Sequence, residues 1–228
     1  MNHLHLKDLE AIELDEDQLF ELRQLVAEGE GGQLEFKRRA SDPGRIVREL
    51  IAFANTHGGT LLVGVNDDGD ISGVKFPEDE SMGIVETLQK SCRPPLVYHE
   101  SVIALSETKF IIRYDIPQSD KRPHFFVDKG LAESYVRVND MSIKASAEMQ
   151  EIIKRSKKKK DIRFAYGEHE KLLMTYLAEH TTITLDQFRA LTKLNRFKAS
   201  RKLILLVLAN VLKITASEKG DIYSMPLR

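Results

Sequence analysis

Several features that would reveal a function directly are rare or missing in the 228-residue sequence. It contains one cysteine, Cys92, and a single thiol cannot form an internal disulfide, which fits a reducing compartment. We expect Cys92 to be a small core residue. This cysteine and the seven histidines show no zinc-like spacing. No Gly-x-x-x-x-Gly-Lys-Ser/Thr string occurs, so nothing in the sequence supports ATP binding, and we expect no cofactor for a binding protein.

Long apolar runs are also missing. The most apolar stretch, residues 203–212, is interrupted by Asn210 and is far shorter than the roughly 18 residues that a membrane span requires. The first residues lack the basic start and apolar core of a signal peptide. We therefore expect a cytoplasmic protein without a membrane partner.

Charge is distributed unevenly, although the formal net charge of the whole chain is only −1. Residues 151–228 hold 17 Lys and Arg against 8 Asp and Glu, which gives them a formal charge of +9 and leaves −10 for residues 1–150. Such an asymmetry favours a polyanionic partner for the basic half. The simpler alternative is a solvated basic face that has no partner. The run Lys157–Lys160 marks a boundary between two domains.

Local patterns predict a mixed α/β region before that boundary. Asp42 suits the N-cap of a helix and Pro43 its first position, and this helix ends at His57 before two glycines. A buried strand at 60–65 and the turn residues that follow it predict a partner strand at 71–74. The other expected elements are helices at 17–27, 78–91 and 147–154, and strands at 33–37, 97–105, 109–116, 123–127 and 134–138, of which the last two form a hairpin or strand pair.

From Glu168 onward the pattern changes to three helices followed by two strands. Thr184 and Gln187 predict a capping box at the start of the second helix. The third helix, from Arg196, is basic and polar at its start and apolar from Leu203 onward, which is typical of a recognition helix. The strands and the turn between them are expected at 213–216, 221–225 and 218–220. This order of elements resembles the winged-helix DNA-binding family.

The winged-helix resemblance implies contacts to nucleic acid, mostly through phosphates. The expected contact residues of the third helix and the wing are Arg196, Lys198, Ser200, Arg201, Lys202 and Lys219. Winged helices also serve as protein-interaction modules, so an assembly module is an alternative. In that case residues 203–212 would be part of a dimer contact.

Three strings in the first half resemble the Schlafen/AlbA-type DNA-binding domain. They are GEGGQLEFK at 29–37, AFANTHGG at 52–59 and LLVGVNDDG at 61–69. Residues 122–124 and 134–138 look like later blocks of the same family, so the likeness covers Gly29 to Ser146. Bacterial members often carry a C-terminal winged helix and are usually described as transcriptional regulators.

The same resemblance implies an enzymatic alternative. Schlafen proteins of animals cleave RNA with two glutamates and an aspartate, which match Glu30, Glu35 and Asp67. Such carboxylates can hold Mg²⁺ or Mn²⁺, which orients water and stabilises a phosphate under attack. The first aspartate of the family's usual pair is Asn66 here. Each residue also has a simpler explanation. Glu30 could lie in a solvated loop, and Glu35 could lie on the exposed face of a strand and pair with Lys37. Asp67 is explained by the residue preference of a turn.

The leading hypothesis is a DNA-binding transcriptional regulator that is not an enzyme. Its expected fold is α+β, with a mixed α/β Schlafen/AlbA-like domain followed by a winged helix-turn-helix domain. A basic cluster is a further candidate for nucleic-acid contacts, and it consists of Lys37, Arg38, Arg39, Arg45 and Arg48. We expect a homodimer, because two-fold operators mirror protein symmetry. The expected divisions are 1–28 for a leader and first helix, 29–154 for the Schlafen/AlbA-like domain, 155–167 for a basic linker and 168–228 for the winged helix.

Overall fold

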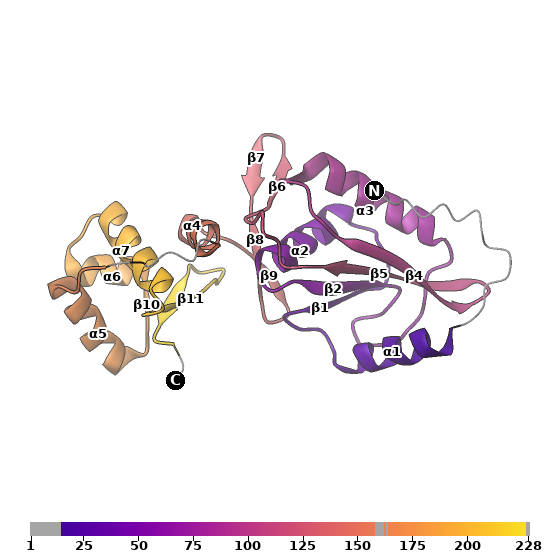
Figure 1. The fold of residues 1–228 in the computed structure, drawn as a ribbon, viewed down its shortest axis with the longest axis horizontal. Coiled ribbons are helices and arrows are strands. Elements are labelled where there is room, and N and C mark those ends of the chain that lie inside the picture. The colour runs from indigo at the N-terminus through magenta and orange to yellow at the C-terminus, as the bar shows by residue number, and fades with distance from the viewer. Residues whose placement is uncertain (1–14, 158–161, 163, 227–228) are drawn as a thin grey trace.

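The computed structural model of the chain describes residues 15–157, 162 and 164–226. The start of the predicted leader and Lys158–Lys160 of the basic run lie outside the described residues. Figure 1 shows a larger N-terminal part built around a sheet, a smaller C-terminal unit, and a helix between them.

A four-stranded mixed sheet is the centre of the N-terminal part, and its strand order is β1-β2-β5-β4. Its strands are β1 (Leu34–Lys37), β2 (Gly59–Val63), β4 (His99–Ser106) and β5 (Lys109–Ile116). β1 and β2 are parallel, whereas β5 is antiparallel to both of its neighbours. Both edges of β2 are therefore occupied, and the predicted pairing of 60–65 with a strand at 71–74 is wrong. Residues 71–74 form only isolated bridges, Val65 with Ile71 and Val74 with Phe110.

Helices cover both faces of this sheet (Figure 1). α2 (Pro43–Asn55) and α3 (Pro77–Ser91) lie over one face, and α1 (Glu16–Ala27) lies over the other. Side chains of a strand alternate between the two faces. Accordingly Leu61 packs in the core beneath α2 and α3, whereas Leu62 packs in the core beneath α1. A charged side chain on these strands is thus not automatically exposed to solvent.

The start and end of α2 follow from local chemistry, as the sequence predicted. The Asp42 carboxylate accepts a hydrogen bond from the Arg45 backbone N–H at 2.9 Å, and Pro43 occupies the first turn. The helix ends before Gly58, whose φ of +78° favours glycine. A Cβ at Gly58 would lie 2.6 Å from the Ile116 carbonyl oxygen, so glycine also permits the close approach to β5.

Short strands complete the N-terminal part. A three-stranded sheet has the order β3-β6-β7, and a two-stranded ladder joins β8 to β9. These strands are β3 (Cys92–Arg93), β6 (Phe125–Asp128), β7 (Leu131–Glu133), β8 (Tyr135–Val138) and β9 (Met141–Lys144). The predicted pairing of 123–127 with 134–138 is therefore wrong. Lys129 and Gly130 adopt positive φ between β6 and β7, and Asn139 does so between β8 and β9, so each strand pairs with its immediate neighbour through a tight turn.

Asn55, in the last turn of α2, ties this helix to the segments that precede and begin β6 and β8. Its side chain is buried, and its Nδ2 donates to the carbonyl oxygens of His124 (3.1 Å) and Tyr135 (2.9 Å). Its Oδ1 accepts from the His124 backbone N–H at 2.7 Å. One amide thus binds three backbone groups that lie far away in the sequence.

Asn55→Ala is expected to lower the free energy of unfolding by about 3 kcal/mol, because it removes all three of these hydrogen bonds and leaves the His124 carbonyl oxygen with the Ser134 hydroxyl as its donor. Urea unfolding followed by circular dichroism measures the change. Gln33→Ala is the control, since Gln33 is exposed and its amide makes one hydrogen bond, to the His57 carbonyl oxygen at 3.2 Å. Equal losses in the two variants would contradict a special role for Asn55.

The C-terminal unit contains three helices and a three-stranded antiparallel sheet of order β10-β12-β11. Its elements are α5 (Glu168–His180), β10 (Thr182–Thr184), α6 (Leu185–Thr192), α7 (Arg196–Leu208), β11 (Lys213–Thr215) and β12 (Ile222–Ser224). The three predicted helices and two predicted strands are confirmed, and β10 is additional. The capping box is also confirmed, since the Gln187 side chain accepts from Thr184 N–H at 2.8 Å and the Thr184 hydroxyl accepts from Gln187 N–H at 3.3 Å.

An apolar core forms inside this unit. It is formed by Leu173, Leu177, Ile183, Phe188, Ala199, Leu203, Leu206, Leu212 and Tyr223. Leu203, Leu206 and Leu212 belong to the segment that the assembly alternative places in a dimer contact, and they pack inside the unit.

The helix α4 (Ala147–Ser156) joins the two parts, and it packs against α7. Met149 and Ile153 of α4 share an apolar cluster with Val136 of β8 and with Ile214 and Ala216 of the C-terminal unit. The Ser146 hydroxyl also donates to the Asp221 carboxylate. The two parts are thus in direct contact. Within the described ranges, no helix has the length and apolar character that a membrane crossing demands.

Candidate nucleic-acid interface and buried charge cluster

The helix α7 has one buried face and one exposed basic end. The Asn195 side chain caps it by accepting from Lys198 N–H at 2.9 Å. Ala199, Leu203 and Leu206 point into the core, whereas Arg196, Lys198 and Arg201 are exposed. The predicted gradient from a basic start to an apolar end is therefore present in three dimensions.

The predicted contact residues of α7 differ in their surroundings. The Lys202 ammonium lies 2.5 Å from the carboxylate of Glu170, a buried residue of α5. Arg196 lies 3.9 Å from the exposed carboxylate of Asp186. Lys198 and Arg201 form no ion pair within the part of the chain that the structure describes, and Ser200 is half-buried. The cations available to a ligand are thus mainly Arg196, Lys198 and Arg201.

The turn between β11 and β12, the predicted wing, lies against the N-terminal part. Lys219 in this turn is exposed. Its neighbour Glu218 lines a cavity of about 260 Å³ together with Arg45, Arg48 and Arg137 of the N-terminal part. No local sequence pattern predicts this contact, because it joins residues from two different parts of the chain.

A buried charge cluster lies next to this cavity and is centred on Glu35. The carboxylate of Glu35 accepts hydrogen bonds from the Arg137 guanidinium and from the Lys37 ammonium. Arg137 also donates to the Gly31 carbonyl oxygen at 3.0 and 3.1 Å, and its guanidinium lies 5.0 Å from the centre of the Phe53 ring. The predicted pair with Lys37 is therefore confirmed, but the predicted exposure of Glu35 is wrong.

Sequence reasoning missed Arg137 as a partner of Glu35. The two residues are 102 positions apart, and the side chain of Arg137 is only 2% exposed. A signal was nevertheless present, since Arg137 belongs to the 134–138 block that resembles the family.

Glu49 on α2 is a second buried carboxylate of this cluster. It lies 3.4 Å from the Lys37 ammonium and 3.4 Å from Arg45 Nε. Burial, together with the negative charge of Glu35, raises the pKa of Glu49 to about 7, and the two cations only partly oppose this shift.

The pKa of Glu49 predicts a pH-dependent stability. A carboxyl whose pKa is higher in the folded chain than in the unfolded one binds more protons when folded, so stability falls as pH rises from about 4.5 to 7. The free energy of unfolding of the wild type, relative to Glu49→Gln, is expected to fall by about 2–3 kcal/mol between pH 5 and pH 8. Urea unfolding at several pH values measures this difference. Glu107→Gln, in the exposed β4–β5 turn, is the control, and a difference for Glu49→Gln that does not vary with pH would contradict the prediction.

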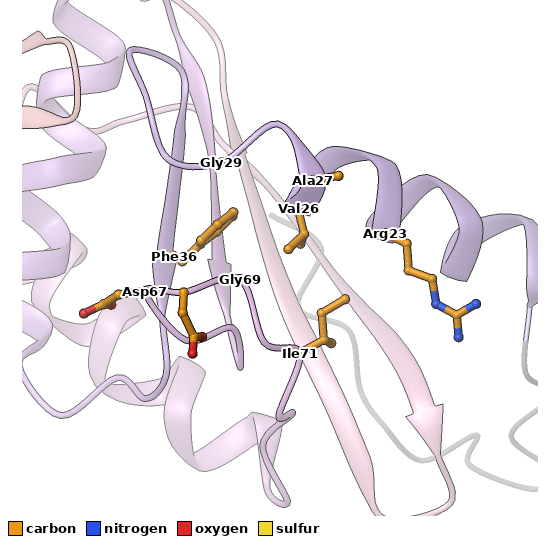
Figure 2. A pocket seen from close by; sticks show the side chains of 9 residues that line it. Arg23, Val26, Ala27, Gly29, Phe36, Asp67, Gly69 and Ile71 are labelled. Carbon is orange, nitrogen blue, oxygen red and sulfur yellow. The ribbon is translucent and has the colours of Figure 1, made fainter.

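The three carboxylates of the predicted metal site are not brought together. Glu30 is exposed, and its carboxylate accepts from the Phe36 backbone N–H at 2.8 Å. Asp67 is exposed in a turn and lines a separate cavity with Phe36 and Val26 beneath α1, as Figure 2 shows. Glu35 precedes Phe36 on β1 and therefore faces α2 and β8 on the opposite side of the sheet. Among residues 15–157, 162 and 164–226, no group of three or more His, Cys, Asp or Glu side chains is placed to hold a metal ion.

The predicted basic cluster of the N-terminal part does not form one exposed patch. The Lys37 side chain is 18% exposed, and its ammonium binds Glu35 and the Phe36 carbonyl oxygen. Arg39 Nε lies 2.5 Å from the Glu80 carboxylate, whereas Arg38 is exposed. Lys37 thus balances buried carboxylates instead of forming one exposed patch with Arg38 and Arg39.

Comparison with known proteins identifies a relationship in the N-terminal part. Residues 30–146 match the family described as Schlafen, AlbA_2. No curated protein matches the chain. The N-terminal domain of a Nitrosomonas europaea protein that is named as related to the ATP-dependent DNA helicase RecG shares 22% identity and has a TM-score of 0.40, covering 65% of this chain and 98% of that one. The DIP2311 protein of Corynebacterium diphtheriae shares 15% identity and has a TM-score of 0.43, covering 92% of this chain and 39% of that one.

Proposed function

The chain belongs to the Schlafen, AlbA_2 family, which suggests a nucleic-acid-binding domain, and on that basis we propose that it is a DNA-binding transcriptional regulator. In this proposal residues 168–226 form a winged helix, and α7 is its recognition helix. The observation that carries the proposal is the exposed basic end of α7, with Arg196, Lys198 and Arg201 on a helix whose other face is buried.

Two further features support DNA as the ligand. The C-terminal unit has three helices and an antiparallel sheet, an element order that supports the winged-helix proposal. The formal charge of +9 over residues 151–228 favours a polyanion. A recognition helix reads base edges in the major groove while the surrounding cations contact phosphates.

The proposal is tested by titrating a labelled duplex DNA with the full chain at several salt concentrations. Three to four phosphate contacts predict a fall in affinity of roughly 40- to 150-fold between 50 and 200 mM salt. Binding that is absent, or that does not depend on salt, would contradict the proposal.

The same titration includes a structured RNA with and without Mn²⁺. Cleavage of that RNA only in the presence of the metal would move the function to the N-terminal part and leave the C-terminal unit as a targeting device. Light scattering of the free and DNA-bound protein tests the homodimer that a two-fold operator implies, by comparing the measured mass with that of one chain.

A further inference from the structure

The first turn of α7 carries an aromatic side chain that the fold does not use. Phe197 is 73% exposed, the highest value among the large apolar side chains of the described residues. It stands between Arg196 and Lys198, both of which are exposed. Exposing such a ring to water is unfavourable, so a contact that covers it would be favourable.

The position of Phe197 on α7 determines which residues lie on the same face of the helix. Residues three and four apart lie on one face of a helix, so Ser200 and Arg201 lie on the same face as Phe197. Ala199, Leu203 and Leu206 occupy the face that packs into the core. Arg196 and Lys198 flank Phe197 in the sequence and Arg201 shares its face, and this positive charge complements a polyanion better than an apolar protein surface.

A phenylalanine ring restricts what can be contacted on such a polyanion. The ring cannot form hydrogen bonds with base edges, and in a duplex the base faces are hidden by stacking. The apolar group that the major groove offers is the 5-methyl group of thymine. Phosphate contacts from Lys198 and Arg201 would hold the first turn of α7 at the groove.

We propose that Phe197 contacts thymine methyl groups in the major groove and thereby gives the protein a preference for A·T pairs at that position. This inference rests on the proposed function, because it requires α7 to enter the major groove of duplex DNA. It adds a sequence preference to what would otherwise be phosphate binding alone.

The test removes or adds the methyl group without changing base pairing. The full chain is titrated with four duplexes of equal length: alternating A·T, the same duplex with deoxyuridine for thymidine, alternating G·C, and the same duplex with 5-methylcytosine. Removing a contacted methyl is expected to weaken wild-type binding by roughly fourfold, and adding one to G·C is expected to strengthen it by a similar factor.

Three variants assign the effect to the ring. Phe197→Ala is expected to bind thymine and uracil duplexes equally, and Phe197→Leu, which keeps an apolar side chain, is expected to retain part of the preference. Phe20→Ala removes a ring that is 60% exposed on α1 and is expected to behave as the wild type. Because Phe197 is exposed, its removal should leave folding intact, and circular dichroism confirms this for each variant.

Other outcomes would overturn the inference. If Phe197→Ala loses as much affinity on uracil substitution as the wild type, another residue reads the methyl group. If methyl removal has no effect but Phe197→Ala weakens binding to a duplex with a single-stranded overhang, the ring stacks on unpaired bases. If Phe197→Ala changes only the mass measured by light scattering, the ring lies in a contact between two copies of the chain. If the wild type binds none of the four duplexes, the proposed function fails, and the inference fails with it.

Discussion

Replacement of Arg137 by methionine is expected to lower the free energy of unfolding by about 3–5 kcal/mol, the range measured when one partner of a buried ion pair is removed. The side chains of Arg137 and Glu35 are 2% and 7% exposed, so solvent cannot replace the lost guanidinium. Glu35 would then be paired with Lys37, which it shares with Glu49. The Gly31 carbonyl oxygen would also lose the donor that it has in the wild type.

Urea unfolding of matched variants separates this effect from the loss of any arginine. Arg113→Met is the control, because Arg113 also pairs with a carboxylate, that of Asp115 at 2.8 Å, but its side chain is 31% exposed. This control is expected to cost less than about 1 kcal/mol. The double variant Glu35→Gln/Arg137→Met should regain part of the stability, since it removes the buried charge as well. A loss in Arg137→Met no larger than that in Arg113→Met would show that the pair does not organise the fold.

The position of Glu35 shows why the sequence predicted its strand but not its surroundings. Leu34 and Phe36 are apolar and flank Glu35, and such alternation usually indicates one buried and one solvated face. Here helices cover both faces of the sheet, so the polar position of the alternation is buried as well. The partner that makes this burial tolerable comes from β8, and no local pattern links it to β1.

Local signals were more reliable where a few neighbouring residues decide the structure. The N-cap of α2 and the capping box of α6 depend on side chains three positions from the groups that they bind. Strand pairing was less predictable, because the positive-φ positions at Lys129 and Asn139 decide which strands become neighbours. The contact of the β11–β12 turn with the N-terminal part depends on how the two parts of the chain pack together, and no pattern within either segment predicts it.

Lys198 and Arg201 are the two cations of α7 that form no ion pair among the residues that the structure describes, and reversing their charges is expected to have the largest effect on DNA binding. Lys198→Glu/Arg201→Glu should weaken binding to duplex DNA by about 100-fold at about 0.1 M salt, roughly tenfold for each charge that changes from attraction to repulsion. The neutral variant Lys198→Gln/Arg201→Gln should lose less affinity and should reduce the slope of log affinity against log salt by about 2, because two phosphate contacts are gone. Both positions are exposed, so the helix should form in each variant.

A control with the same change in net charge distinguishes a local contact from general attraction. Lys75→Glu/Lys90→Glu alters two exposed lysines of the N-terminal part by the same total charge. If α7 enters the groove, this control should weaken binding by less than about threefold, since exposed charges beyond a Debye length of about 10 Å are largely screened. Equal losses of affinity in the two double variants would mean that the overall charge of the protein holds it on the DNA. The assignment of α7 as a recognition helix would then be wrong. A selective loss in the α7 variant would locate the DNA on the same surface that Phe197 occupies.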